Sequence, residues 1–536
     1  MATNYYMGLN PFTLTNIETL ETKEFKNFDD ILTAALKASC TVYVYDLDKL
    51  ARTIVNKLDK LGFAEEITNE LENGIMTKIG PKKFITVGSV EERTTVLIRA
   101  RRTVKAQTVF QNAHGLFGKA TIEDICMAAI GENDEIFGMC AAIDNLLSQG
   151  HTAWTLAGNA LKDLKNECFA NKEGKYADLN FKERFPKLEE EVHNFVMSSF
   201  QGGICYFNPK FQGTFMVKGT EYDVNSMYPS VMLDEFLPYG EPTYFEGQFD
   251  TKITIKPYYF QRVTIEKLTI MADGVPCIRN KQAKNYFTIA ENVELVLNHI
   301  DMEMLFDNYT VEGIKYVDGY RFDARKKMFD KFINKWAKQK QEAEDGSFER
   351  MYAKLMLNSA FGKFASKTDK RASYYKKTKD GVLVRQKKLG NNKTEGQSVY
   401  APVGAYITSF AGQRLIKAIK ANKENFIYSD TDSIYVKGEA VGLELDPKKF
   451  GAWKEEFKFD KMCVLGKKYY CVQKTDGTIK VSLAGIPDRA VEENIKTFDD
   501  FHIGKKIDFS IVEYDFEGIA APKKMPTIIL DINNKQ

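Results

Sequence analysis

The chain has 536 residues, enough for three or four folding units of roughly 150 residues each. Its 75 Lys and Arg residues nearly balance 73 Asp and Glu residues, giving a net charge of +2, and 44% of the residues are hydrophobic. This composition excludes a disordered or collagen-like chain. No apolar run approaches the ~20 residues that cross a bilayer, and the first residues do not have the pattern of a signal peptide. We therefore expect a cytoplasmic protein without membrane contact.

Cysteine and histidine usage limits the metal chemistry that we expect. The eight cysteines are scattered without a CxxC pair, so we interpret them as reduced thiols. The five histidines lie far apart in the sequence, which argues against a zinc site built on histidine. Any metal site should therefore be made of carboxylates.

The first third of the chain alternates strand-like and helix-like segments. Residues 41–47 and 94–102 are rich in β-branched and apolar side chains, which predicts strands, whereas residues 51–63 have the spacing of an amphipathic helix. A helical pattern also follows residue 133. These features indicate an α/β domain of about 160 residues, and a Lys- and Glu-rich junction follows at residues 171–190.

The middle of the chain changes from strands to helices. Residues 213–224 predict a strand, residues 237–320 are β-rich, and residues 324–343 and 348–364 predict long helices. Residues 363–393 then carry eleven Lys or Arg and two Asp. Such a basic run is either a solvated loop or the electrostatic footprint of a nucleic-acid contact, and by itself it supports both equally.

Two aspartates lie close together in YSDTDSIYV, after a predicted helix over residues 400–421. In a strand, Asp430 and Asp432 would project to the same face. Two carboxylates this close repel each other unless a cation lies between them. The alternative is a polar hairpin turn, where Asp, Thr and Ser are common, and for an isolated DTD string this is the more frequent explanation.

Two further motifs change that balance. YDVNSMYPS places Asp223 at the end of a strand before a turn and a helix, although a capped helix start gives the same pattern. KLMLNSAFGKFA places Lys354, Asn358 and either Phe361 or Gly362 along one helical face, although an amphipathic surface helix would too. All three motifs in this order are improbable by chance.

Together these motifs resemble those of protein-primed family-B DNA polymerases from small tailed phages and linear plasmids. The connecting segments LPYGEPTYFEG, VYAPVGAYITS and LDPKKFGAW are also similar. The likeness is strong over residues 190–501 and weaker over residues 25–165. It implies a multidomain α/β and α+β fold, in which a right-hand polymerase with palm, fingers and thumb follows a degenerate ribonuclease-H-like domain.

The resemblance also implies the parts of the chain and their partners. In chain order the parts are a degenerate exonuclease-like domain (1–165), the first part of the palm (190–240), a palm insertion that contacts the priming protein (241–323), the fingers (324–365), a second palm insertion that wraps DNA (366–399), the second part of the palm (400–455) and the thumb (456–536). The implied partners are template DNA, deoxynucleoside triphosphates and a terminal, priming protein. We expect the chain to be a monomer.

In this family two Mg²⁺ ions, which Mn²⁺ can replace, clamp the primer hydroxyl and the nucleotide phosphates. The resemblance implies that Asp223 and Asp432 are the principal metal ligands, together with the backbone carbonyl of Val224. It implies that Asp430 is a supporting catalytic carboxylate.

The nucleotide site follows from the same resemblance. Lys354 would meet the negative charge of the triphosphate, assisted by Arg350 or Lys340. The ring of Tyr228 would lie under the sugar and exclude a 2′-hydroxyl. The residues implied around the nascent base pair are Asn358, Phe361 (where the family usually has Tyr) and Gly362.

Two short motifs are expected to position DNA. FQGG matches the family's YxGG, with Phe200 in place of Tyr, and Gly202 and Gly203 would allow the backbone to approach the template closely. KKYY fits the family's KxY as Lys467 and Tyr469, or one residue later, and would steady the primer end. The alternative for KKYY is a solvated basic edge strand.

The exonuclease motifs of the family are incomplete here. No DxE occurs in the first 160 residues, Leu50 occupies the expected position of a catalytic Asp, and in the third motif only Asp134 survives, with Ile130 in place of Tyr. One carboxylate cannot hold the two metals that phosphodiester hydrolysis requires. We expect this domain to be a scaffold that lacks its first strands and does not proofread.

The sequence therefore predicts a template-directed DNA polymerase without proofreading that initiates on a protein hydroxyl. One alternative is a polymerase that extends a DNA primer or primes itself. The other is a non-catalytic DNA-binding relic, and the intact set of Asp223, Asp430, Asp432 and Lys354 argues against it. Tyr228 argues against synthesis of RNA.

Overall fold

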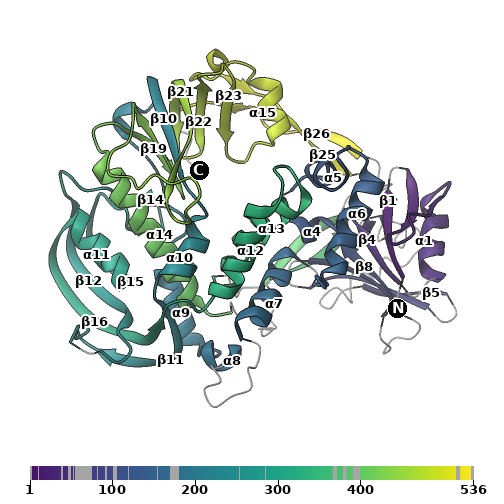
Figure 1. Ribbon diagram of the computed structural model, residues 1–536, viewed down its shortest axis with the longest axis horizontal. Helices are drawn as coiled ribbons and strands as arrows, with labels where there is room; N and C mark the ends of the chain where they lie inside the picture. The colour runs from purple at the N-terminus through teal and green to yellow at the C-terminus, as the bar shows by residue number, and fades with distance from the viewer. Residues whose placement is uncertain are drawn as a thin grey trace.

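The computed structural model of the chain is shown in Figure 1. The residues that it describes are 3–9, 11–37, 40–45, 47, 50–51, 53–54, 75–80, 83–90, 93–99, 106–118, 120–153, 155–169, 180–252, 254–283, 285–365, 371–377, 383–389, 399–514 and 520–532. Within these residues, no helix is both long enough and apolar enough to span a membrane.

An eight-stranded sheet forms the N-terminal domain, in the order β3-β2-β1-β4-β8-β7-β6-β5. Its strands are β1 (Thr3–Leu9), β2 (Phe12–Asn16), β3 (Thr22–Glu24), β4 (Cys40–Val44), β5 (Ile75–Gly80), β6 (Lys83–Val90), β7 (Arg93–Arg99) and β8 (Ala106–Asn112). β4 pairs in parallel with β1 and with β8, and the other neighbours are antiparallel. The expectation that this domain lacks its first strands is wrong, because β1 and β2 bury apolar side chains against β4 and α1.

Helices flank this sheet and lead toward the middle of the chain. They are α1 (Phe28–Lys37), α4 (His114–Phe117), α5 (Ile122–Ile130), α6 (Glu135–Ser148) and α7 (Leu156–Phe169), followed by α8 (Phe181–Arg184) and α9 (Glu190–Ser199). A capping box of Thr121 and Asp124 starts α5, and the carboxylate of Asp134 accepts a hydrogen bond from the backbone N–H of Phe137 at the start of α6. Side-chain caps of this kind satisfy the free N–H groups of a first helical turn.

A seven-stranded antiparallel sheet lies on the other side of the molecule, in the order β23-β22-β21-β10-β20-β19-β9. Its strands are β9 (Cys205–Phe207), β10 (Phe215–Val224), β19 (Phe426–Asp430), β20 (Ser433–Lys437), β21 (Trp453–Gly466), β22 (Tyr469–Lys474) and β23 (Ile479–Leu483). Helices α10 (Met227–Asp234) and α14 (Ala401–Ala421) pack together beside this sheet. The predicted helix, the predicted hairpin and the strand at residues 213–224 are all present.

A four-stranded sheet of long strands adjoins it, in the order β11-β16-β12-β15. Its strands are β11 (Leu237–Glu246), β12 (Tyr258–Ile270), β15 (Ile289–Asn298) and β16 (Tyr309–Arg325), with α11 (His299–Asn308) between the last two and a small ladder of β13 (Arg279–Asn280) and β14 (Asn285–Tyr286) nearby. The expected boundaries at 240, 323 and 455 fall within β11, β16 and β21, each of which is one continuous strand.

Two helices, α12 (Asp330–Glu342) and α13 (Phe348–Phe364), stand between the two halves of the molecule (Figure 1). The predicted helix over 324–343 begins only at residue 330, because β16 continues to residue 325. The indole N–H of Trp336 donates to Asp163 of α7 at 2.6 Å, and Lys335 forms an ion pair with the same carboxylate at 2.8 Å. Trp336 is 1% exposed, so this contact joins α12 firmly to the N-terminal domain.

The remaining described elements are short. They are the hairpin of β17 (Arg371–Lys377) and β18 (Leu383–Leu389), helix α15 (Asp488–Asn494), the pair β24 (Lys506–Ile507) and β27 (Ile528–Ile529), and the hairpin of β25 (Ser510–Tyr514) and β26 (Ala520–Lys524). The β17–β18 hairpin lies beside β6 of the N-terminal sheet and carries the basic segment that the sequence indicated. The connecting residues 366–370, 378–382 and 390–398 lie outside the described residues.

Candidate active site

The two aspartates of the DTD motif lie in a tight turn between β19 and β20. Asp430 ends β19, and the backbone N–H of Asp432 donates to the carbonyl of Asp430 at 2.7 Å. Thr431 occupies the left-handed region with a φ of 62°, which costs a non-glycine residue about 1–3 kcal/mol. Strain of this size persists only where the surroundings hold the backbone in place. The conformation turns the chain sharply and leaves a carboxylate on each side of the turn.

Asp223 reaches the same place from a neighbouring strand. β10 pairs with β20 so that Asp223 lies opposite Ser433, and the N–H of Val224 donates to the carbonyl of Asp432 at 2.8 Å. Burial, together with the nearby charge of Asp432, raises the pKa of Asp223 to about 7. Burial also raises the pKa of Asp432. The structure thus brings together the two carboxylates that the resemblance pairs.

Several charged side chains around this pair were not singled out from the sequence. Lys454 lies opposite Asp223 on β21, with its ammonium 3.8 Å from the carboxylate, and it also pairs with Glu456. Glu221, 4% exposed, forms an ion pair with Lys480 at 2.9 Å. The sequence signals only the short spacing between Glu221 and Asp223 along β10. The lysines come from β21 and β23, and the tertiary structure decides which strands pair with each other in the sheet.

The donor chemistry of the site fits a hard divalent cation. Carboxylate oxygens are the ligands that Mg²⁺ prefers, and Asp223 and Asp432 are two adjacent carboxylates whose pKa values are raised by burial and by neighbouring negative charge. Both oxygens of Asp430 are otherwise engaged: Oδ1 accepts from the Thr431 hydroxyl at 3.1 Å, and Oδ2 pairs with Lys468. Among the described residues, no three His, Cys, Asp or Glu side chains form a metal-binding group.

Cations from the helical pair face these carboxylates. Burial lowers the pKa of Lys340 on α12, and the positive charges of Lys354, Lys454 and Arg350 lower it further, whereas Asp223 raises it. Lys340 donates to the Ser226 hydroxyl at 3.3 Å. Arg350 instead bonds the carbonyl of Lys340 and pairs with the carboxylate of residue 345 at 2.8 Å. Of the two helper cations considered, Lys340 therefore points to the carboxylates and Arg350 secures the end of α12.

The predicted nucleotide residues share one region. The ring of Tyr228, at the start of α10, stacks on Phe361 of α13 with centroids 4.3 Å apart and planes at 29°. Lys354, Asn358 and Gly362 lie at successive turns of α13 and are exposed, whereas the helix's opposite face is buried. This arrangement leaves a polar helical surface beside the aromatic pair and above the carboxylates.

The two motifs expected to position DNA flank the carboxylates. Phe200 follows α9, and the side chain of Gln201 accepts the backbone N–H of Arg279 at 3.2 Å. This loop borders a hollow of about 680 Å³ that Arg279 and Lys281 also line. In the other motif, Lys467 donates to Asn285 at 3.0 Å. The Tyr469 hydroxyl donates to the carbonyl of residue 484 at 3.1 Å, and its side chain is 9% exposed.

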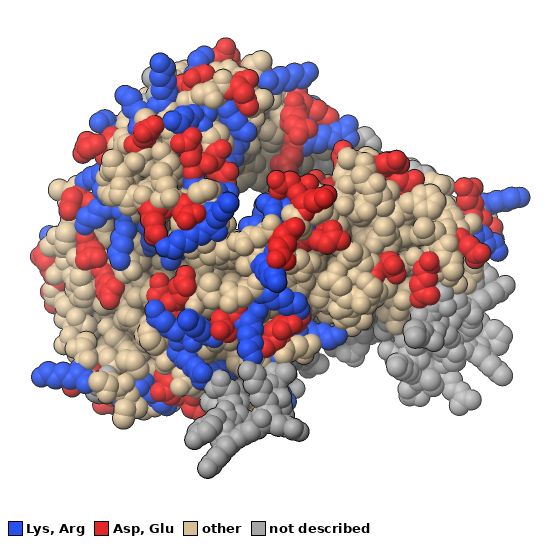
Figure 2. All heavy atoms as spheres, in the orientation of Figure 1, with Lys and Arg blue, Asp and Glu red and all other residues tan. Residues whose placement is uncertain are grey.

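The space-filling view shows the surface around the carboxylate site. Figure 2 has an opening near the centre of the molecule, and Lys and Arg side chains gather along its left and lower edges. In the ribbon view the same place lies between α12 and α13 on one side and the seven-stranded sheet with α15 on the other (Figure 1). The positively charged rim is suited to a polyanion.

The residues expected from the exonuclease motifs serve the fold. Leu50 is fully buried in the apolar cluster of the N-terminal sheet, among Ile31, Val42 and Phe110. Asp134 caps α6 through the N–H of residue 137 at 3.1 Å. The carboxylates at positions 46 and 48, which precede Leu50 in the sequence, lie outside the described residues.

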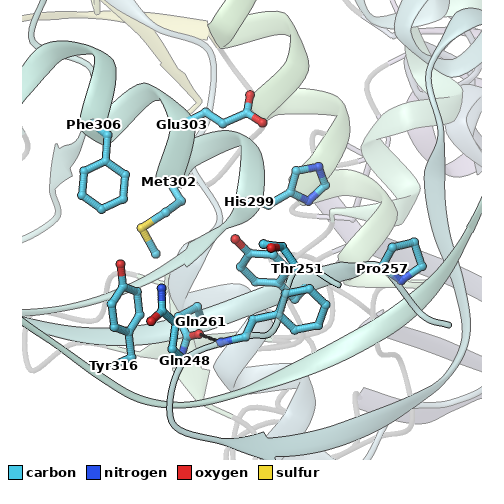
Figure 3. Close-up of a pocket in the computed structure, with 11 residues that line it drawn as sticks. Gln248, Thr251, Pro257, Gln261, His299, Met302, Glu303, Phe306 and Tyr316 are labelled. Carbon is cyan, nitrogen blue, oxygen red and sulfur yellow. Dashed lines mark hydrogen bonds between the residues drawn. The ribbon is translucent and has the colours of Figure 1, made fainter. Parts of the chain in front are cut away.

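A separate cavity of about 410 Å³ lies between the four-stranded sheet and α11 (Figure 3). Its lining includes His299, Met302, Glu303 and Phe306 of α11, and Met302 and Phe306 extend toward Tyr316 of β16. Burial lowers the pKa of His299 to about 4, so its ring is neutral at physiological pH. None of the cavity's lining residues belongs to the carboxylate site.

Removal of the Asp223 charge should change the thermal stability of the protein measurably in the absence of substrate. Below about pH 4 this carboxyl is protonated in both the folded and unfolded chains, and its stabilising contribution is lost as pH rises through about 7. We expect Asp223→Asn to raise the Tm of the EDTA-treated protein by about 2–4 °C near pH 8 and by less near pH 5. Calorimetry at both pH values measures this difference, and an equal shift at both would contradict it.

Comparisons with known proteins place this geometry in a family. The family model described as DNA polymerase type B, organellar and viral, matches residues 142–441. The DNA polymerase of Bacillus phage Nf is 32% identical over 393 residues, which cover 68% of this chain and 65% of the phage protein. That of Streptococcus phage Cp-1 is 29% identical over 70% of this chain and 65% of its own length. That of Bacillus phage phi29 is 27% identical over 90% of this chain and 89% of its own.

Solved structures agree at the level of the fold. The structure of phi29 DNA polymerase complexed with primer-template DNA and incoming nucleotide substrates has a TM-score of 0.81 at 24% identity, and covers 99% of this chain and 100% of that one. The predicted multidomain right-hand fold is therefore confirmed. The matched family model spans more than half of the chain, and the family that the three motifs indicated is confirmed as well. The chain belongs to the organellar and viral type B family of DNA polymerases.

Proposed function

We propose that this chain is a template-directed DNA polymerase that adds deoxynucleotides by two-metal-ion nucleotidyl transfer. The observation that carries the proposal is the convergence of Asp223 and Asp432, two carboxylates with raised pKa values, opposite the lysines of α12 and α13. Such an arrangement needs both a cation between the carboxylates and an anion beside the lysines. A metal-bound nucleoside triphosphate supplies both.

Asp223 and Asp432, with the carbonyl of Val224, would hold two Mg²⁺ ions, and Mn²⁺ would fit the same oxygen donors. When bound, such ions activate the attacking hydroxyl and stabilise the leaving phosphate oxygen. Asp430 supports the site without free oxygens of its own, since Thr431 and Lys468 engage both. The turn and its neighbours therefore fix the carboxylates before any ligand binds.

The lysines face the site where a triphosphate would lie. Lys354 is exposed on α13, and the pKa of Lys340 responds to the charges of both Lys354 and Asp223. Positive charges placed in advance stabilise the negative charge that develops during phosphoryl transfer. We assign the contact with the triphosphate to Lys354 and Lys340. Arg350, bonded to the carbonyl of Lys340, would orient the end of α12.

Sugar selection would depend on the stacked pair of Tyr228 and Phe361. Phe361 holds the Tyr228 ring face to face at 4.3 Å, so the ring cannot easily swing away from an incoming sugar. A fixed aromatic ring leaves no room for a 2′-hydroxyl. Asn358 and Gly362, exposed on the same helix, would then border the nascent base pair.

Template DNA and deoxynucleoside triphosphates are the proposed substrates. The phi29 polymerase was solved with primer-template DNA and incoming nucleotides, and the basic rim of the central opening supports the same ligands here (Figure 2). We assign the palm to the seven-stranded sheet, the fingers to α12 and α13, and the thumb to the segment after residue 455. Phe200, Gly202, Lys467 and Tyr469 are the proposed DNA-binding residues, and Gly203 of the same motif lies against Thr431 of the carboxylate turn.

We also propose a terminal protein as primer, which would dock on the insertion at residues 241–323. Large apolar side chains are exposed there, including Tyr244 at 49%, Ile255 at 71%, Ile289 at 67% and Phe306 at 43%. Exposed apolar side chains of this size are typical of partner-binding surfaces. The alternative is extension of a DNA primer, and incubation with labelled nucleotide and each candidate primer separates the two.

The metal site gives the direct test of the proposed function. Asp432→Asn removes one metal-binding charge while the side chain keeps its shape, so nucleotide incorporation should fall at least about 10³-fold. Binding of primer-template should change little and the Tm should not fall, because the side chain contributes no core contact and its charge is crowded against that of Asp223. Primer extension with Mg²⁺ measures incorporation, a gel-shift assay measures binding of primer-template, and calorimetry measures the Tm. Incorporation retained within about tenfold would falsify the metal assignment.

The sugar gate makes a second prediction. Tyr228→Val removes the ring that opposes the 2′-hydroxyl, and we expect discrimination against ribonucleotides to fall by about 10²-fold, as for the loss of a few kcal/mol of steric exclusion. Phe361→Leu, which only loosens the stacked ring, should give a smaller loss. The ratios of kcat/KM for ribonucleotides and deoxynucleotides report the effect. Unchanged discrimination in Tyr228→Val would place the gate elsewhere.

Proofreading should be absent. Leu50 is buried among apolar side chains and Asp134 caps a helix, so neither supplies a metal site for hydrolysis. The protein should not shorten a 3′-labelled single strand in Mg²⁺ or Mn²⁺, and Asp134→Ala should leave this unchanged while lowering stability by about 1 kcal/mol. If the wild-type chain degrades the strand and Asp134→Ala stops it, the domain retains a working nuclease.

A further inference from the structure

Gly203, the last residue of the FQGG motif, lies directly against the turn that carries the catalytic carboxylates. A Cβ atom at this position would be 2.5 Å from the hydroxyl oxygen of Thr431, 2.9 Å from its methyl group and 3.1 Å from its Cβ. All three distances are shorter than ordinary van der Waals contact. Gly203 does not have a positive φ, so the requirement for glycine here is one of space and not of backbone conformation.

The preceding glycine has a different environment. A Cβ at Gly202 would meet only the guanidinium end of Arg279, at 3.6 Å, which is ordinary contact with a flexible side chain. Two adjacent glycines of one motif therefore differ sharply. Gly202 borders open space, as expected for a residue that approaches DNA. At Gly203, by contrast, Thr431 occupies the space that a side chain would need.

Backbone contacts make the loop and the turn one unit. The N–H of Thr431 donates to the carbonyl of Ile204 at 2.7 Å, and β9 continues from there with Cys205 opposite Asp430. The Thr431 hydroxyl donates to Asp430 at 3.1 Å. Displacement of Thr431 would therefore move Asp430 directly, and it would move Asp432 through the strained backbone of the turn.

The opposite side of the turn is also held. Lys468, from the KKYY hairpin, pairs with Asp430, and its backbone N–H donates to the Tyr428 hydroxyl at 3.1 Å. The turn thus lies between the two motifs that the sequence associates with DNA. With its other flank secured, the turn has little room to yield to a side chain at Gly203.

We infer that Gly203 is a positioning residue for the catalytic turn, whose missing side chain seats Thr431 and thereby sets the positions of Asp430 and Asp432. The inference rests on the proposed polymerase function. It differs from the expectation that both glycines serve the approach of DNA, because it assigns the effect of Gly203 to the chemical step and not to DNA binding.

Gly203→Ala and Gly202→Ala form a matched pair for the test. Each is made in the wild-type chain and in Thr431→Gly, which removes all three atoms that the added methyl would meet and also suits the positive φ of residue 431. Four quantities are measured for each protein: kcat at saturating primer-template, the Kd for primer-template without metal, the affinity for Mn²⁺ by electron paramagnetic resonance without DNA, and the Tm.

In the wild-type background, we expect Gly203→Ala to lower kcat by about tenfold or more, to weaken Mn²⁺ binding and to leave the Kd for DNA within about twofold. In the Thr431→Gly background the added methyl no longer meets the Thr431 side chain, so Gly203→Ala should change kcat by less than about twofold. Non-additivity of this kind is expected between residues that are in contact. Any effect of Gly202→Ala should fall on the Kd for primer-template, and it should have the same size in both backgrounds, because a Cβ at Gly202 does not meet Thr431.

The inference is overturned if Gly203→Ala leaves kcat unchanged, if it acts on the Kd for DNA instead, or if its effect on kcat persists with Thr431→Gly. If Gly203→Ala is insoluble, a soluble double variant supports the inference and an insoluble one overturns it. Failure of the proposed function is recognised separately. In that case the wild-type chain itself incorporates no nucleotide and binds no Mn²⁺.

Discussion

The backbone hydrogen bond between Val224 and Asp432 is the contact on which the site depends. It joins the end of β10 to the turn after β19, and so places Asp223 beside Asp432. The sheet geometry imposes this approach on two like charges that would otherwise separate. Burial raises the pKa of both carboxyls, and a neighbouring carboxylate adds to the rise in each case, Asp432 at Asp223 and Asp430 at Asp432. The fold thereby gives up stability at the place where we propose that a cation binds, a compromise that functional sites often show.

Several lysines lie around Asp223 and Asp432. Lys454 lies 3.8 Å from Asp223, Lys468 pairs with Asp430, and Lys480 neutralises the buried Glu221 behind the site. Each of these lysines comes from β21 to β23 or the hairpins between them, whereas Lys340 comes from the helical pair. The carboxylates are thus balanced on one side by the sheet itself. On the other side the positive charge comes from Lys340 of α12.

The N-terminal domain has kept a structural role in this arrangement. The Trp336 indole and Lys335 bind Asp163 of α7, so the helical pair is supported from the domain that carries the incomplete exonuclease motifs. Loss of metal-binding carboxylates is compatible with this role, since the contact uses α7 and not the sheet. Leu50 in place of a carboxylate even adds apolar contact to the domain core.

The sequence by itself determined the family, the long helices and the strand ends that carry Asp223, Asp430 and Asp432, because these depend on local periodicity and on short motifs. It did not identify Lys454 or Lys468 as neighbours of the carboxylates, nor the different environments of Gly202 and Gly203. Strand register and the packing of a loop against a turn decide those contacts. The contacts of Asp223 with Lys454 and of Gly203 with Thr431 join residues more than 200 positions apart, and no local pattern records which strand will lie beside another.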